Sequence, residues 1–579
     1  MSGTTQTCDY SFDPEEWAAD REYDPIVEDD LLTDGRWECD RTTAADETRC
    51  LFHRPIDEKD GAAVRRQFVE ELSTKPADTS VDAVADNRFI GARFRDFDFS
   101  NRVLRLDNNV PVDLRFAHVA GDLACDQFVV ENTFRFEGSV VEGTADFRRC
   151  RAASIVDLSG CVFERGADFS DSRFEDHVWG IETGFRDTTK FDRAEVRGDL
   201  CLAGAVVGDD LRIAGSQIEG GVVLSRMECQ GGLLFDANDV GGDVWCVGTT
   251  VHSDSDSGNL LSKNEVGNDL RIKQSTFAGK LSLEKTVVES ELLVESTTVE
   301  SQWLDFTNCD VHAGVLKQPA TGQVMYDFTE ATMGNIELHA ESGNRFEFCR
   351  FENTTFERFD FGRHRSLLHR SDWTIHTVGD DAGSGGGILE LFERASAKLH
   401  WLKDSLTSSE PTELRDHVVN ETTYLKAKNG ANRMGDNKAA AEFFIKEMGF
   451  RRRRHAETAL NGRGTDEGGL LTRLKAAGAW VANVGLSATT GYGEKPHRVL
   501  LSAGAIMAVF AVFYGAVPSD HYVSNVGAAE ALLLSFQSFV TFILGEAPAG
   551  DSFLLRVTST LEGLIGAFLV ALSVFALTR

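Results

Sequence analysis

The sequence has few basic residues for its length, and this shortage argues against a surface that binds nucleic acid. Its 579 residues include 59 Lys and Arg against 92 Asp and Glu, a formal net charge of −33. A phosphate-binding surface must instead be basic. The acidic excess spreads over most of the chain, as expected of a protein that stays hydrated in a high-salt cytoplasm. Cation buffering is the alternative interpretation.

Two further absences concern the compartment of the protein. Residues 1–30 contain no apolar run, so we expect no secretory signal and an amino terminus that stays in the cytoplasm. Eleven cysteines in so long a chain form no dense short-loop framework, which argues against a disulfide scaffold. Most of the cysteines are expected to be buried as small hydrophobic side chains.

Two long apolar segments near the carboxyl end predict transmembrane helices. Val499–Pro518 holds no charge, and Val557–Thr578 carries only Glu562; about twenty apolar residues are needed to cross the hydrocarbon. Between them, Ala531–Gly545 is uncharged but shorter, the size of a re-entrant segment. No Lys or Arg occurs in residues 519–555, whereas a membrane-surface basic cluster precedes the first helix, comprising Arg451, Arg452, Arg453 and Arg454. The positive-inside rule therefore predicts a multi-pass protein of the cell membrane with both termini in the cytoplasm.

This order of helix, short re-entrant helix and helix resembles the pore module of potassium-channel-like proteins. Leu561–Ala567 and the stretch that follows it to Arg579 resemble the inner helix of that family, and Ser538–Phe542 resembles its pore helix. The family's filter reads Thr-x-Gly-Tyr-Gly, and four subunits line up its carbonyls. Here Thr541 is followed by Phe-Ile-Leu-Gly545-Glu546.

The resemblance implies an ion channel that assembles as a homo-oligomer, a tetramer, in the lipid bilayer. Thr541, Gly545 and Glu546 would then lie nearest the permeation path, and a ring of Glu546 carboxylates would select cations. The alternative is a membrane-anchored scaffold without conduction, on which a protein partner binds. Upstream, residues 489–493 spell Thr-Thr-Gly-Tyr-Gly, but no uncharged span precedes them, so a turn leading into the first helix is predicted there.

An eleven-residue repeat dominates the chain before the membrane segments. Three apolar columns begin at Val112, Leu114 and Val119 and continue without an insertion to Val244, Cys246 and Val251. Residues i and i+2 lie on one face of a strand, and i+7 points inward after a bend. The spacing therefore predicts a parallel β-helix with eleven-residue half-coils, in which residues 86–362 make about a dozen coils stacked ~4.8 Å apart.

Two segments of this repeat, Ala145-Asp146-Phe147 and Ala167-Asp168-Phe169-Ser170-Asp171, resemble the core of pentapeptide-repeat proteins. The resemblance is partial, because that family's repeat steps by five residues and this one steps by five plus six. The resemblance implies a solenoid, but we do not infer from it that this chain mimics DNA. The outward Asp, Glu and Arg side chains scatter around the coil instead of clustering, so no enzyme is predicted.

Cys8, Cys39, Cys50 and His53 form the one metal-like set in the sequence. The last three are spaced C-x10-C-x2-H, which is not the spacing of a standard zinc finger. Three thiolates and an imidazole nevertheless suit tetrahedral zinc in a closed structural site. Two alternatives stay open: a structural zinc, or unliganded cysteines in a short cap that covers the first coil.

The complete prediction is a multidomain chain. It comprises a Cys/His cap at 1–60, a linker or helix at 61–85, the parallel β-helix at 86–362, a flexible linker at 363–387, an α-helical connector at 388–460, an interfacial segment at 461–494 and a two-helix transmembrane module with a re-entrant pore helix at 495–579. His364, His369 and His376 lie in the predicted linker and are expected to be solvated.

Overall fold

The computed structural model describes residues 6–19, 27, 31–44, 46–73, 87–105, 111–252, 259–339, 343, 345–376, 412–461, 470–494, 496–516, 527–544 and 553–578. The chain divides into two compact units, Met1–Gly383 and Ser384–Arg579. Residues 377–387 of the predicted flexible linker, residues 388–411 of the predicted connector and the pore residues Gly545 and Glu546 lie outside the described residues.

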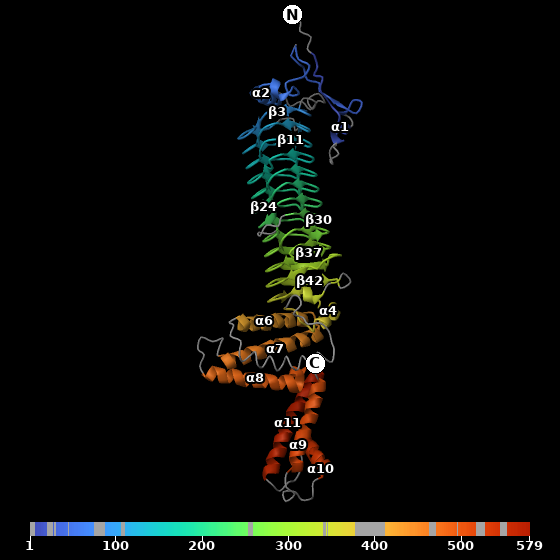
Figure 1. Ribbon diagram of the computed structural model, residues 1–579, viewed down its shortest axis with the longest axis vertical. Coiled ribbons are helices and arrows are strands. Elements are labelled where there is room, and N and C mark those ends of the chain that lie inside the picture. The colour runs from blue at the N-terminus through green and yellow to red at the C-terminus, as the bar shows by residue number, and fades with distance from the viewer. Residues whose placement is uncertain are drawn as a thin grey trace. The chain divides into compact units, whose positions relative to one another are not determined.

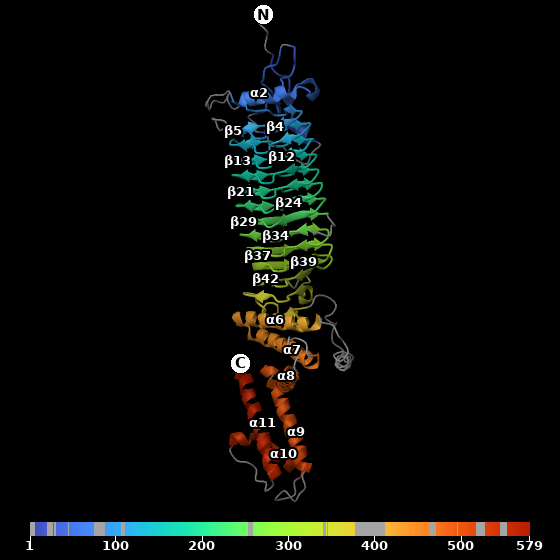
Figure 2. The same cartoon turned by 90° about the vertical axis from the view of Figure 1, so that its left-hand side faces the viewer.

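The first unit is built around a parallel β-solenoid of about eleven turns (Figures 1 and 2). Within the described residues its strands form three parallel sheets of 20, 12 and 10 strands. One coil consists of β11 (Val140–Val141), β12 (Ala145–Asp146), β13 (Arg151–Ala152) and β14 (Val156–Asp157). The next strand, β15 (Val162–Phe163), pairs in parallel with β11, and Val140 faces Val162. A coil therefore takes 22 residues, which confirms the predicted eleven-residue half-coil.

The three apolar columns of the sequence form the core of the solenoid. Parallel pairing at a 22-residue step from β6 (Val112–Asp113) to β31 (Thr250–Val251) places equivalent residues over one another, so each column becomes a continuous stack. Phe147, Phe169 and Phe191 stack with ring centroids 4.7 and 4.5 Å apart. Ten of the eleven cysteines are buried, and all eleven are free thiols, in agreement with the prediction of buried small side chains.

Each half-coil turns at a residue in the left-handed backbone region. These corners recur every eleven residues, for example at Gln127 (φ 56°), Gly138 (φ 67°) and Arg149 (φ 56°). Glycine adopts this conformation freely, whereas most other residues cost about 1 kcal/mol or more there. The regular corners explain how a short half-coil reverses direction at the same place in every turn.

A column of buried polar residues follows the corners, and the apolar repeat in the sequence did not predict it. At many of the corners the next residue is polar, points inward and donates a hydrogen bond to a carbonyl of the preceding coil. Ser216 Oγ donates to Phe191 O at 2.5 Å, and Asn238 Nδ2 donates to Ile213 O at 2.8 Å. The same role is taken by Ser139, Ser172, Thr183, Thr249, Ser275, Thr286 and Thr297. We call this set the polar column.

An amino-terminal cap closes the first coil. It contains α1 (Pro14–Ala18), the antiparallel strands β1 (Ser11–Phe12) and β2 (Trp37–Glu38), and α2 (Gly61–Ser73). Helix α2 lies across the end of the solenoid (Figure 2), and its buried Phe68 packs against Phe52, Phe89 and Phe97. Of the predicted linker or helix at 61–85, residues 61–73 are helical, and residues 74–85 lie outside the described residues.

The carboxyl end of the solenoid extends beyond the predicted boundary at residue 362. Strand β44 (Thr355–Phe356) is followed by α4 (Arg365–Arg370), whose Leu367 and Leu368 are buried, and Phe351 N donates to Ile375 O at 3.0 Å. The start of the predicted flexible linker is therefore an ordered cap, because its apolar side chains cover the last coil. His364 is buried rather than solvated, with Nε2 3.4 Å from Ile336 O.

The second unit is helical. It comprises α6 (Thr412–Arg433), α7 (Asn437–Asn461), α8 (Leu470–Thr490), α9 (Pro496–Ala516), α10 (Ala528–Leu544) and α11 (Phe553–Thr578). Helices α6, α7 and α8 pack in succession, and α9, α10 and α11 pack against one another (Figure 1). Asp436 caps the start of α7, since its Oδ1 accepts a hydrogen bond from Ala439 N at 3.0 Å.

Candidate metal centre and apolar helix bundle

The four residues of the predicted metal set come together in the amino-terminal cap. The ligand atoms of Cys8, Cys39, Cys50 and His53 all lie within 4.8 Å of one another, and all four residues are buried. Cys39 Sγ lies 4.0 Å from Cys50 Sγ, and His53 Nδ1 lies 3.6 Å from Cys8 Sγ and 3.2 Å from Cys50 Sγ. Sulfur ligands around tetrahedral zinc are roughly 3.8 Å apart, given Zn–S bonds of about 2.3 Å.

Two local structures position these ligands. Cys8 and Cys39 flank the paired strands β1 and β2, where Cys8 N donates to Arg41 O at 2.8 Å and Cys39 N donates to Tyr10 O at 3.0 Å. Cys50 and His53 share one tight turn, because His53 N donates to Cys50 O at 3.1 Å. An antiparallel strand pair and a turn therefore each supply two ligands, which explains why the sequence spacing does not match a standard finger.

The surroundings of His53 fix which ring nitrogen faces the sulfurs. Its Nε2 lies 2.9 Å from Ile90 O, so this nitrogen carries the proton and Nδ1 keeps its lone pair. The Tyr10 ring stacks on the imidazole with centroids 4.0 Å apart. Hydrogen bonds with the Cys39 and Cys50 side chains hold the pKa of the Cys8 thiol far below its usual range. The cluster therefore favours at least one thiolate, the form that binds metal.

The helices α9, α10 and α11 form a bundle that buries few side chains and has an apolar outer surface. Val499, Phe539 and Leu569 form one buried cluster, and a side chain added at Gly566 would collide with the carbonyl of Phe539. On the outside, Leu500 is 70% exposed. Further exposed apolar side chains are Leu501, Val509, Val512, Leu532, Phe536, Leu561, Leu564 and Phe568. Among the described residues, one stretch, His497–Ala516, is long and apolar enough to cross a membrane.

Glu562 is the one carboxylate of the two predicted spans, and it is fully buried between three helices. Its Oε2 accepts a hydrogen bond from Tyr514 OH of α9 at 2.7 Å, and its Oε1 accepts one from Ser535 Oγ of α10. The sequence had shown Glu562 only as a charge near the start of a helix. Its partners lie 48 and 27 residues away, so no local pattern could identify them.

The predicted pore residues are only partly within the described chain. Thr541 lies in the last turn of α10, while Gly545 and Glu546 lie outside the described residues. The filter-like segment at 489–493 includes a short turn between α8 and α9, in which Tyr492 OH donates to Asn483 Oδ1 at 2.7 Å.

The predicted membrane-surface basic cluster, Arg451–Arg454, makes contacts inside the helical unit. Arg451 pairs with Glu447 and Glu421 at 2.9 and 2.7 Å, and Arg454 pairs with the same Glu421 at 3.0 Å. The Arg452 guanidinium donates to Ser487 Oγ at 3.1 Å. Packing between α6, α7 and α8 thus explains much of this cluster without a lipid headgroup.

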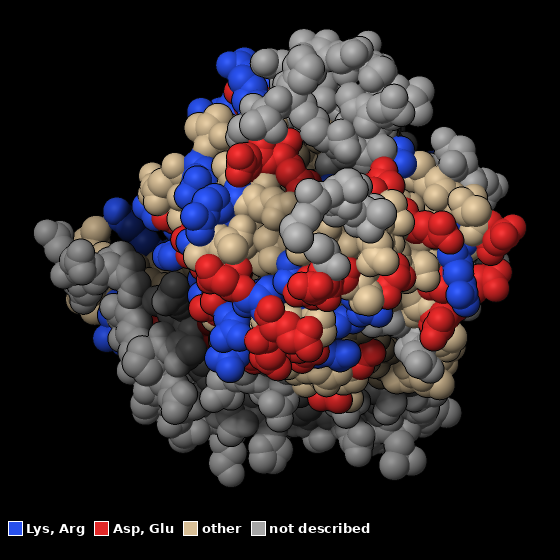
Figure 3. All heavy atoms as spheres, turned by 90° about the horizontal axis from the view of Figure 1, so that it is seen from above, with Lys and Arg blue, Asp and Glu red and all other residues tan. Residues whose placement is uncertain are grey.

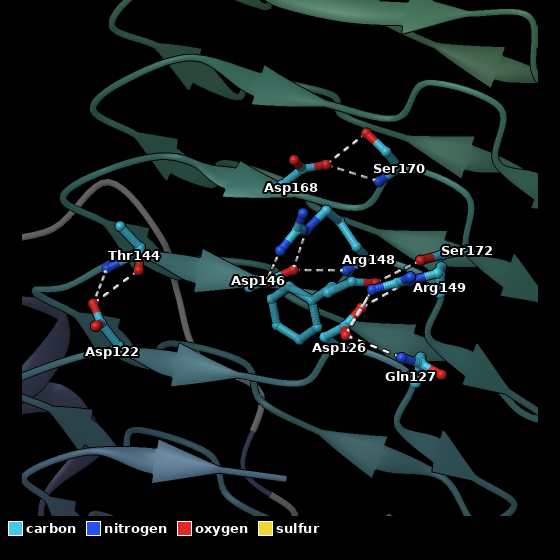
Figure 4. A network of polar contacts seen from close by, with 11 residues as sticks. Asp122, Asp126, Gln127, Thr144, Asp146, Arg148, Arg149, Asp168, Ser170 and Ser172 are labelled. Carbon is cyan, nitrogen blue, oxygen red and sulfur yellow. Dashed lines mark hydrogen bonds and ion pairs between the residues drawn. The ribbon is translucent and has the colours of Figure 1, made fainter. Parts of the chain in front are cut away.

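The outer surface of the solenoid carries acids and bases that pair with each other. Arg149 binds Asp126 of the preceding coil at 2.7 Å, and Arg148 binds Asp146 at 2.6 Å (Figure 4). Figure 3, which is seen from above, shows acidic and basic side chains next to one another at the amino-terminal end as well. These ion pairs are exposed, so each contributes at most about 1 kcal/mol.

A comparison with protein-family models supports the repeat that the solenoid is built from. The family described as pentapeptide repeats (9 copies) matches residues 136–179. The solenoid carries pentapeptide repeats. Within it, the 22-residue coil of four short strands is the pentapeptide-repeat-like architecture that the sequence predicted. Searches of curated proteins and of solved structures found no match.

Proposed function

We propose that this chain is an integral membrane protein in which α9, α10 and α11 enter the bilayer as an ion-channel-like pore module, with the pentapeptide-repeat solenoid on the cytoplasmic side. The observation that carries the proposal is the apolar exterior of this bundle. Leu500, Val512 and Leu564 are 70, 74 and 60% exposed. Leaving such a side chain in water instead of burying it costs about 1.5–3 kcal/mol.

Three features favour lipid as the partner of this surface. Helix α9 has 21 residues, so at about 1.5 Å per residue it is ~31 Å long, the thickness of the hydrocarbon core. The carboxylate of Glu562 is buried and hydrogen-bonded within the bundle, as intramembrane charges must be. Basic residues precede α9 and are absent from residues 519–555, as expected when the first side is the cytoplasm.

Conduction requires several subunits around one axis. A single bundle packs α10 between α9 and α11 and fills its interior with side chains. The homo-oligomer, a tetramer by resemblance, would bring one Glu546 from each subunit into a ring, and carboxylate rings favour cations. Gly545 would allow the turn before it.

Recordings from the full-length protein in planar bilayers test conduction. We expect cation-selective currents that Glu546→Gln reduces several-fold or makes less selective. The control is Glu442→Gln on α7, which removes the same charge outside the bundle and should leave the currents unchanged. Silence of the wild type at every voltage, in protein shown to be inserted and tetrameric, would refute conduction.

A membrane-anchored scaffold is the second candidate function. The observation that favours it is that Glu562 finds both hydrogen-bond partners, Tyr514 and Ser535, within one chain. The bundle therefore satisfies its buried carboxylate without another subunit. In this case the solenoid presents its surface to a protein partner. A monomer in detergent, with no current in bilayers, would favour the scaffold over the channel.

A further inference from the structure

We propose that Cys8, Cys39, Cys50 and His53 bind one zinc ion, and that this ion holds the amino-terminal cap on the first coil of the solenoid. This inference concerns the first unit and does not depend on the function proposed for the membrane module.

The donor set selects the metal. Three thiolates and one imidazole are soft and borderline ligands, which suit zinc and not magnesium or calcium. The four side chains are buried, and four protein ligands fill a tetrahedron and leave no position for water, as in a structural site. A disulfide between Cys39 and Cys50 would need a sulfur separation of about 2.05 Å, and the observed separation is 4.0 Å.

The loop that carries two of the ligands is also bonded to the first coil. Phe52 lies between Cys50 and His53, and its carbonyl accepts a hydrogen bond from Arg93 N of β3 (Arg93–Phe94) at 2.9 Å. His53 contributes a second bond through Nε2 and Ile90 O at 2.9 Å. The ligand loop therefore continues the backbone pairing of the solenoid at its open end.

Side chains complete the contact between the loop and the coil. The Lys59 ammonium donates to Leu51 O at 3.1 Å and to Phe52 O at 2.8 Å. Tyr10, which stacks on His53, also lies against Gly91, where any side chain would collide with its ring. A metal that fixes Cys50 and His53 therefore also fixes the groups that cover the first coil. Covering this edge protects unpaired backbone groups from pairing with another chain.

Metal content is the first test, made on the full-length protein purified in detergent without added metal. We expect about one zinc ion per wild-type chain. The zinc affinity should fall about ten-fold or more in Cys39→Ser and Cys50→Ser, since losing even a residue that hydrogen-bonds a metal ligand costs 10–100-fold in affinity. Cys125→Ser is the matched control, because Cys125 is a buried free thiol of the solenoid core and should keep the zinc. Zinc retained in both cluster variants overturns the proposal.

Two measurements on the wild type remain informative if the variants fail to fold. Cobalt(II) added to metal-free protein should give the absorption of a tetrahedral thiolate site; no cobalt spectrum with reduced thiols, or a Cys39–Cys50 disulfide found by mass spectrometry, overturns the proposal. Chelation should speed hydrogen exchange in residues 50–54 and in β3, but not in β24 (Leu211–Ala214). Equal exchange in the cap with and without zinc overturns the role assigned to the metal.

Discussion

Replacing Asn238 by alanine tests the polar column most sharply. Asn238 is 2% exposed and bonds to both neighbouring coils: its Oδ1 accepts from Ser216 N at 2.9 Å, and its Nδ2 donates to Ile213 O at 2.8 Å and to Asn264 Oδ1 at 3.1 Å. Alanine removes all three bonds and leaves buried backbone groups that lose a partner. Each such group costs about 1–3 kcal/mol, so we expect Asn238→Ala to lower the free energy of local opening by about 3 kcal/mol.

Hydrogen exchange of the full-length protein measures this effect locally. Since 1.4 kcal/mol corresponds to a factor of about ten, the amides of β24 (Leu211–Ala214) and β25 (Gln217–Ile218) should exchange about 100-fold faster in the variant. Asn238→Ser should lose less, because serine performs the same role at Ser216. Gln217→Ala, on the exposed side of β25, should stay within about 0.5 kcal/mol of the wild type. Refutation would be an Asn238→Ala variant that exchanges no faster than Gln217→Ala.

Three other predictions concern the rest of the solenoid. Asp113→Ala should lower the free energy of unfolding in denaturant by about 3–5 kcal/mol, because it removes the carboxylate bound at 2.7 Å by the buried guanidinium of Arg115; a loss below 1 kcal/mol contradicts this. Gly215→Ala (φ +66°) should cost about 1 kcal/mol, whereas Ala237→Gly (φ 56°) should gain a similar amount; changes of the same sign would argue against strain at the corners. Burial lowers the pKa of His364 below its usual 6.5. As the pH falls below 6.5, the His364 side chain is therefore protonated in the unfolded state before it is protonated in the folded state. The contribution of neutral His364 to the stability of α4 is complete above pH 6.5 and is lost as the pH falls further. Exchange in α4, corrected for the intrinsic rate, should therefore be faster at pH 5.5 than at pH 7.5, and equal protection at both values would contradict the assignment.

The solenoid could be predicted from the sequence because parallel stacking of coils repeats the same apolar positions at a regular spacing along the chain. Val140 lies over Val162, so in the regular coils an inward position recurs after 22 residues, and a column such as Phe147, Phe169 and Phe191 can be recognised in the sequence alone. The polar column was missed for a physical reason. Its residues follow the left-handed corners and donate hydrogen bonds to backbone carbonyls, and the sequence does not show which carbonyls point inward.

The metal set could be proposed from residue types but not from spacing. Cys8 and Cys39 meet only because β1 pairs with β2, a long-range contact that no short motif encodes. The Arg451–Arg454 cluster illustrates the same limit, since its partner Glu421 belongs to another helix. For Glu562 the sequence shows a single carboxylate within an apolar segment, but its partners Tyr514 and Ser535 follow only from the packing of three helices.

Alkaline carbonate extraction of cell membranes tests whether α9, α10 and α11 lie in lipid. The full-length chain should stay in the membrane pellet and require detergent for release, whereas a chain truncated after Glu494 should be extracted. Recovery of the intact full-length protein in the carbonate supernatant would contradict the account.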